Sequence, residues 1–163
     1  MQYILKINVV LCALLMSNTV FAENISGPRI GGTFLSNKTI QDAKEKGINV
    51  TNVISQFGWQ FESAFFTTQN GPQGVTALIP MLGGADQGVL IPSISWVTGL
   101  RSQSGFEFAV GPNVSLSGVG MAFSVGKTNK VGEVNFPINV SVVSSNSGMR
   151  VSLLFGFNSI DGH

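Results

Sequence analysis

The sequence predicts an all-β protein, an eight-stranded antiparallel up-and-down membrane β-barrel with one short helix in the first connection. Three observations predict this fold. After residue 22, apolar residues alternate with small or polar residues at period two, which is the periodicity of a β-strand. The same part of the chain contains no apolar run long enough for a transmembrane helix. Only 10% of the residues are charged, whereas soluble domains average about 25%.

The first 22 residues have the layout of a cleaved signal peptide. The apolar run at residues 7–16 is too short to span a membrane, and Ala22 is the small residue expected at a cleavage site. A buried N-terminal helix is the alternative. Cys12, the only cysteine, lies within the apolar run, so we expect no disulfide in the mature chain. Residues 23–163 then form one barrel domain.

The first two strands are expected at about residues 28–35 and 57–65, and the second alternates clearly. The connection between them, about residues 36–52, is the longest in the predicted fold. Within it the sequence predicts a short helix, which Thr39 would cap and Gly47 would end.

Six further strands are expected before residue 158. Two have irregular alternation and four alternate clearly. In chain order they lie at about residues 74–81, 89–100, 106–110, 118–125, 133–142 and 149–157. Short turn-forming segments rich in Gly, Ser, Asn and Pro separate them, as an up-and-down meander requires.

The composition of the two strand faces predicts which face points outward. One face carries Phe, Trp, Met and Val, and the other carries Gly, Ala, Ser, Asn and a few charges. An eight-stranded barrel has a narrow interior that its own side chains fill, so the smaller residues fit inside. The apolar face would then contact lipid. The alternative is a soluble, secreted, lipocalin-like barrel that binds an apolar ligand with its apolar face inward.

The inward face is expected to carry six charges, three positive and three negative. Charges in a narrow barrel are tolerable when they are paired. The functional interpretation of this network is a polar relay or gated pore, and the structural interpretation is a plug, which we favour. The predicted network consists of Arg29, Glu62, Arg101, Glu107, Glu133 and Arg150.

The alternating strands, the balanced inward charges and the aromatic final strand Met149–Phe157 resemble those of small eight-stranded outer-membrane proteins of Gram-negative bacteria, such as the OmpA transmembrane domain and OmpX. The resemblance covers nearly all of residues 23–163, as pattern only. It implies an outer-membrane location, contact with outer-membrane lipids and recognition by the barrel assembly machinery. The chain departs from the family in its last six residues, since family members usually end at the aromatic residue.

Four residues of the predicted wall are singled out. Trp59 and Trp96 are candidates for the aromatic belts at the membrane interfaces, or for ordinary lipid-facing bulk. Pro80 and Pro92 are equally spaced about Asp86 and would face each other in a symmetric hairpin. Two missing N–H donors at one level would make a seam that admits a lipid or another apolar ligand sideways. The favoured alternative is that β-bulges absorb the prolines.

No catalytic or metal site is predicted. The only histidine is His163 at the end of the chain, and no cysteine or internal histidine remains to hold a metal. Catalysis with a Glu base stays conceivable, but no pattern marks it, and no cofactor is expected. No basic patch predicts nucleic-acid binding. We expect a structural or interaction role, with residues 36–52 as a possible contact surface, and a lipid-handling barrel is the alternative.

Overall fold

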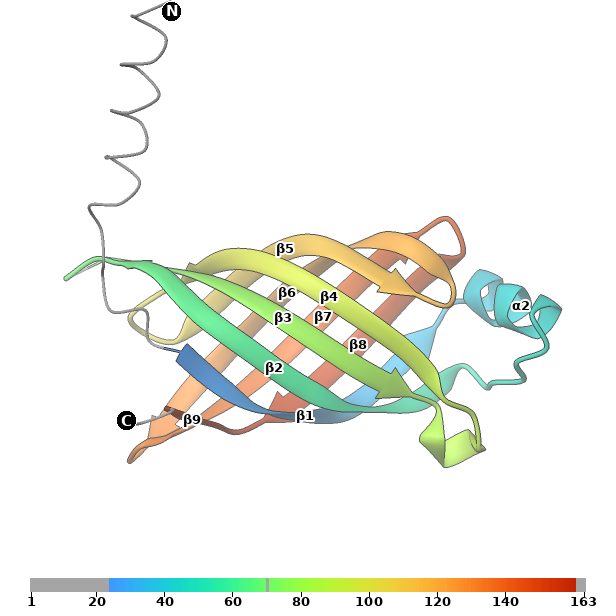
Figure 1. Cartoon of the computed structure of the whole chain (residues 1–163), viewed down its shortest axis with the longest axis horizontal. Helices are drawn as coiled ribbons and strands as arrows, with labels where there is room; N and C mark the ends of the chain where they lie inside the picture. The colour runs from blue at the N-terminus through green and yellow to red at the C-terminus, as the bar shows by residue number, and fades with distance from the viewer. Residues whose placement is uncertain (1–23, 70, 161–163) are drawn as a thin grey trace, which may run out of the picture.

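The computed structural model describes residues 24–69 and 71–160, so the expected signal peptide and His163 lie outside the described residues. It contains nine strands, one α-helix and one short 3-10 helix η1 (Ala85–Gln87) (Figure 1). The elements are β1 (Asn24–Leu35), α2 (Asn37–Glu45), β2 (Val53–Thr67), β3 (Gln73–Gly83), β4 (Ile91–Arg101), β5 (Phe106–Ser115), β6 (Gly118–Val131), β7 (Val134–Ser145), β8 (Gly148–Gly156) and β9 (Asn158–Ile160). No helix of the described residues is long and apolar enough to cross a membrane.

The sheet closes on itself as an eight-stranded antiparallel barrel. Each strand from β1 to β8 pairs with its neighbours in the chain, and β1 also pairs with β8, which completes the wall. The predicted eight-stranded antiparallel barrel and the position of its helix, between the first two strands, are therefore confirmed. The described strands are mostly longer than expected, because strand pairing continues beyond the residues that alternate clearly.

The register fixes the tilt of the strands. Residues opposite each other on successive strands form an interior row that starts at Leu35 and returns to the same strand at Ile25, ten residues away. For eight strands, that offset corresponds to a tilt of about 40°. In order, the interior row contains Leu35, Arg150, Val143, Ala122, Gly111, Val97, Ala77, Glu62 and Ile25. It therefore spirals from one end of the barrel to the other.

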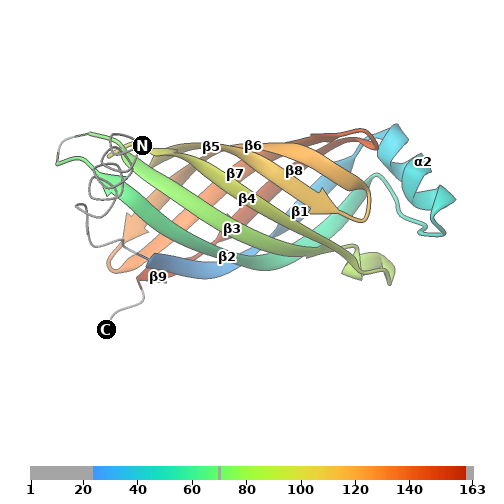
Figure 2. The ribbon, with the colours of Figure 1, turned by 45° about the horizontal axis from the view of Figure 1, so that its top comes forward.

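The two ends of the barrel differ (Figures 1 and 2). One end, here called the helix end, carries α2 and the η1 hairpin, and the opposite end carries β9 and the start of β1. The end that carries β9 and the start of β1 is here called the terminal end. The connection of residues 36–52 has the predicted bounds. Its helix is capped by Ser36 rather than by Thr39, which lies inside the first turn. Gly47 follows the helix with φ 79°, as its predicted role as terminator requires.

Proline residues interrupt the backbone hydrogen bonding between two pairs of neighbouring strands. Pro80 of β3 and Pro112 of β5 lack an N–H, and the β2–β3 and β4–β5 ladders have gaps at their positions. The register places a tryptophan across each gap, Trp59 opposite Pro80 and Trp96 opposite Pro112. Each tryptophan therefore lies at a position where the β-ladder lacks backbone hydrogen bonds.

The end of the barrel lies beyond Phe157. Pairing between β1 and β8 stops at Arg29 and Gly156, next to Pro28, and resumes where Ser26 pairs with Ser159. The short strand β9 also pairs with β7, so it continues the line of β8 between the same neighbours. Part of the tail that departs from the family pattern thus belongs to the wall.

Candidate functional site

The interior at the terminal end is occupied by a connected polar network. Arg101 of β4 contacts Glu62 of β2 at 2.6 Å and Glu107 of β5 at 2.7 Å. The Thr128 hydroxyl donates a hydrogen bond to Glu107. All three charged side chains are largely buried. One guanidinium therefore forms ion pairs with two carboxylates from different strands.

Arg29 of β1 joins this network through neutral side chains. Its Nε donates to Gln60 at 3.1 Å, and Gln60 donates to Glu62 at 2.8 Å. Its Nη1 donates to the Asn158 side chain at 2.7 Å. Asn158 belongs to β9, so the network also anchors the last described strand. The network as a whole contains two arginines and two glutamates, and Arg29 reaches Glu62 only through Gln60.

The middle of the barrel is apolar. Ala77, Val97, Ala122 and Val143 are buried and form one cluster, with Ile79 and Ala109 packed against it. Four of these residues lie in the interior row between Arg150 and Glu62. Along this row, they therefore lie between the polar network at the terminal end and the polar residues at the helix end.

A second polar group lies toward the helix end. Arg150 of β8 reaches across the interior, and its Nη2 donates to the Asn113 side-chain oxygen of β5 at 2.6 Å. Asn113 in turn donates to the Ser95 hydroxyl at 2.8 Å. The side chain of Arg150 is buried, and its Nε has no hydrogen-bond partner among the described residues.

Glu133 is not one of the interior charges, which corrects the prediction. It lies in the two-residue turn between β6 and β7 and is exposed. Gly132 beside it has φ 63°, a left-handed conformation that allows the tight turn. The alternation of inward and outward residues along β6 therefore ends at Val131. The structure places the other five predicted residues inside. The interior charge of the described strands is therefore unbalanced, with Arg29, Arg101 and Arg150 facing only Glu62 and Glu107.

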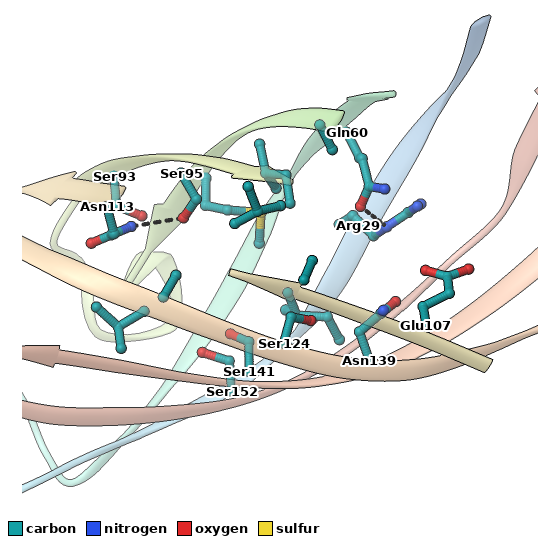
Figure 3. A pocket seen from close by; sticks show the side chains of 18 of the residues that line it. Arg29, Gln60, Ser93, Ser95, Glu107, Asn113, Ser124, Asn139, Ser141 and Ser152 are labelled. Atoms are coloured by element: carbon teal, nitrogen blue, oxygen red, sulfur yellow. Dashed lines mark hydrogen bonds between the residues drawn. The ribbon is translucent and has the colours of Figure 1, made fainter. Parts of the chain in front are cut away.

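An internal cavity of about 80 Å³ lies between these groups. Figure 3 shows Ser93, Ser95 and Asn113 at one side and Arg29, Gln60 and Glu107 at the other. Hydroxyl groups line the wall between them, where Ser124, Ser141 and Ser152 pair in turn on three strands. The volume holds several waters but no extended ligand.

The two prolines of the predicted seam do not face each other. Pro80 pairs with Ile94, and Pro92 pairs with Leu82. The η1 hairpin is centred on Gln87 rather than on Asp86, and a shift of one residue in the centre moves each partner by two. Both prolines line an apolar groove on the outer wall, together with Phe57, Trp59 and Leu116.

The tryptophans lie on the outer wall but not at its rims. Trp59 is the seventh of fifteen residues in β2, and Trp96 is the sixth of eleven in β4. They are 41% and 62% exposed. The prediction that they belong to interface belts therefore does not fit their positions. Exposed phenylalanines occupy strand ends at the terminal end instead, namely Phe65, Phe66, Phe106, Phe136 and Phe157.

The connection of residues 36–52 is tied to the mouth of the barrel. Ser36 and Met149 exchange hydrogen bonds of 3.0 and 3.1 Å, and Lys46 donates to the carbonyl of Leu116 at 3.2 Å. The exposed face of α2 therefore has a fixed position relative to the strands.

Sequence reasoning missed three polar residues of the interior, Gln60, Asn113 and Asn158. The first two share the inward phase of their strands with the predicted charges, which was the signal available for them. Among the described residues, no group of three His, Cys, Asp or Glu side chains is placed to hold a metal. The chain matched no family model, no curated protein and no solved structure.

Proposed function

We propose that this protein is an outer-membrane β-barrel with a plugged interior and a structural or interaction role. The observation that carries the proposal is the character of the outer wall. Large apolar side chains cover it and are widely exposed, among them Ile30 at 62%, Phe57 at 58% and Val125 at 54%. Among the described strand residues, Lys127 is the only charged residue on this face, where it lies 5.1 Å from the ring of Phe106.

An outer wall covered by large apolar side chains is favourable in contact with lipid acyl chains. Soluble monomers rarely expose contiguous apolar patches larger than a few hundred Å². In lipid, a spanning chain must also satisfy its own backbone hydrogen bonds, and a closed barrel does so. The outward apolar face argues against the lipocalin-like alternative, in which that face would surround a ligand.

The interior supports a structural role rather than a pore. The pairs formed by Arg101 with Glu62 and Glu107 occupy the terminal end, and the internal cavity is small, at about 80 Å³. An ion that crossed this barrel would have to pass the buried ion pairs of Arg101 with Glu62 and Glu107. Contacts with partners would then form outside the wall, and residues 36–52 are the candidate surface because they project beyond the helix end (Figure 1).

Two experiments test the proposal. A folded membrane barrel migrates differently on a detergent gel before and after boiling, so we expect heat-dependent mobility for the native protein. In a Gram-negative host we expect the protein in the outer-membrane fraction. Recovery in the soluble periplasm, with the same mobility before and after boiling, would contradict the proposal.

The second candidate function is lipid handling, and one observation favours it. Met81 and Ser93 line both the outer groove at Pro80 and Pro92 and the internal cavity. The wall is therefore thin at this place, and an acyl chain in the groove would lie close to the interior. Replacing both prolines by Val restores two N–H donors and should reduce uptake of a fluorescent fatty acid, while Pro137→Val in β7 should not. Equal uptake by all three proteins would remove this candidate.

A further inference from the structure

The interior of the barrel carries one positive charge that no described carboxylate balances. Four of the five interior charges belong to one connected network at the terminal end. The fifth, Arg150, lies beyond the apolar cluster. Its neighbours in the interior row are Leu35 and Val143, which are both apolar and buried.

The surroundings of Arg150 offer dipoles but no counter-charge. Its side chain is 6% exposed, its Nη2 bonds to the neutral Asn113, and its Nε has no partner among the described residues. Transfer of an uncompensated guanidinium from water to such a place is strongly unfavourable. A bound anion would offset much of that cost, because it supplies the counter-charge that Asn113 does not provide.

We propose that the internal cavity binds a small anion of the size of chloride or formate, held by the guanidinium of Arg150. Arg150 lines this cavity, and the hydroxyl groups of Ser93, Ser95 and Ser152 line it too, as possible further donors. Asn113 acts as the positioning residue, because its hydrogen bond holds the guanidinium across the barrel. The cavity volume of about 80 Å³ excludes a phospholipid headgroup or a nucleotide.

This inference depends on the interior geometry and not on the solvent around the barrel. It therefore holds or fails separately from the membrane proposal. Interior charges that pair fully, such as Arg101 with Glu62 and Glu107, give no reason to expect an ion at the terminal end.

The first test is the thermal stability of the refolded full chain in neutral detergent. The apparent Tm is measured in sodium chloride, sodium formate and sodium gluconate at equal ionic strength, gluconate being too large for the cavity. We expect a Tm several degrees higher in chloride and formate. Arg150→Gln should lose that difference, and Lys127→Gln, which removes a charge from the outer wall, should retain it. A difference that persists in Arg150→Gln, or is absent from the native protein, would overturn the proposal.

A second variant keeps the test decisive if Arg150→Gln fails to fold. Asn113→Asp places a carboxylate where Arg150 already donates its hydrogen bond. We expect this variant to be more stable than the native protein in gluconate and insensitive to chloride. Chloride-35 NMR gives a direct readout, with line broadening by the native protein that Asn113→Asp abolishes. Equal broadening by both proteins would assign the chloride to another site and refute the proposal.

Discussion

The Arg101 guanidinium and the Glu62 carboxylate meet inside the barrel, with 2.6 Å between Nη1 and Oε1. The two residues come from β4 and β2, so this contact holds together strands that are not neighbours in the sheet. Because Arg101 also contacts Glu107, it is the cation on which both interior carboxylates depend.

Arg101→Met should destabilise the barrel by about 3–5 kcal/mol, because it leaves two buried carboxylates without the cation that contacts them directly. Equilibrium unfolding in urea, with the barrel in lipid vesicles, measures the change. The matched control is Lys46→Met, which removes the exposed ion pair with Asp42 and should change little. Equal midpoints for Arg101→Met and the native barrel would show that the network does not support the fold.

A lysine introduced on the outer wall should reveal a membrane by its depth dependence. Val140 lies near the middle of β7 on the outer face, and Val131 is the last residue of β6. In a bilayer, Val140→Lys should cost about 2–4 kcal/mol and Val131→Lys about 0–1 kcal/mol. Unfolding in vesicles measures both variants. If water surrounded the barrel, both substitutions would be nearly neutral.

Two adjacent glycines of β1 should respond oppositely to alanine. A Cβ on Gly31 would lie 1.9 Å from the carbonyl oxygen of Leu153, whereas a Cβ on Gly32 would meet nothing closer than 3.7 Å. Gly31→Ala should therefore destabilise the barrel by about 1–3 kcal/mol through overpacking. Gly32→Ala should be neutral or slightly stabilising, since it reduces the freedom of the unfolded chain. Unfolding midpoints compare the two, and similar losses would contradict the predicted difference.

The η1 hairpin should loosen in acid. The Ser55 side chain and backbone N–H both donate to Asp86, and these hydrogen bonds hold the pKa of Asp86 below its usual value. A lowered pKa means that the stabilising contact is complete above the unfolded pKa and is lost as the pH falls through the folded pKa. Ser55→Ala should raise the pKa of Asp86, as followed by NMR of its carboxyl carbon. The pKa of Asp42, which Lys46 lowers, should not move and serves as the control.

Much of the fold follows from the alternation of residue size and polarity along the strands. The face that contains Phe57, Val140 and Phe155 is outside, as its bulk and the narrow interior require. The sequence could also place Arg29, Glu62, Arg101, Glu107 and Arg150 in the inward phase. The local pattern of residues along each strand was sufficient to predict these features.

The predictions that the structure corrects concern features that are set by long-range strand register or by turn geometry. Glu133 continues the alternation of β7, but the Gly132 turn ends the strand pairing just before it. The partners of Pro80 and Pro92 depend on the centre of a seven-residue connection, which local pattern does not fix. The isolation of Arg150 depends on which charges share an end of a tilted barrel, and that follows from the register of all eight strands.

The register of β1 has a consequence for the order of assembly. The ladder that closes the wall joins Leu35 to Arg150, the first strand to the last long one. Until that last strand has been synthesised, the chain presents two open strand edges, which are templates for aggregation. Closure over so large a sequence separation is also intrinsically slow. Closure of the barrel therefore requires nearly the whole described chain, from β1 to β8.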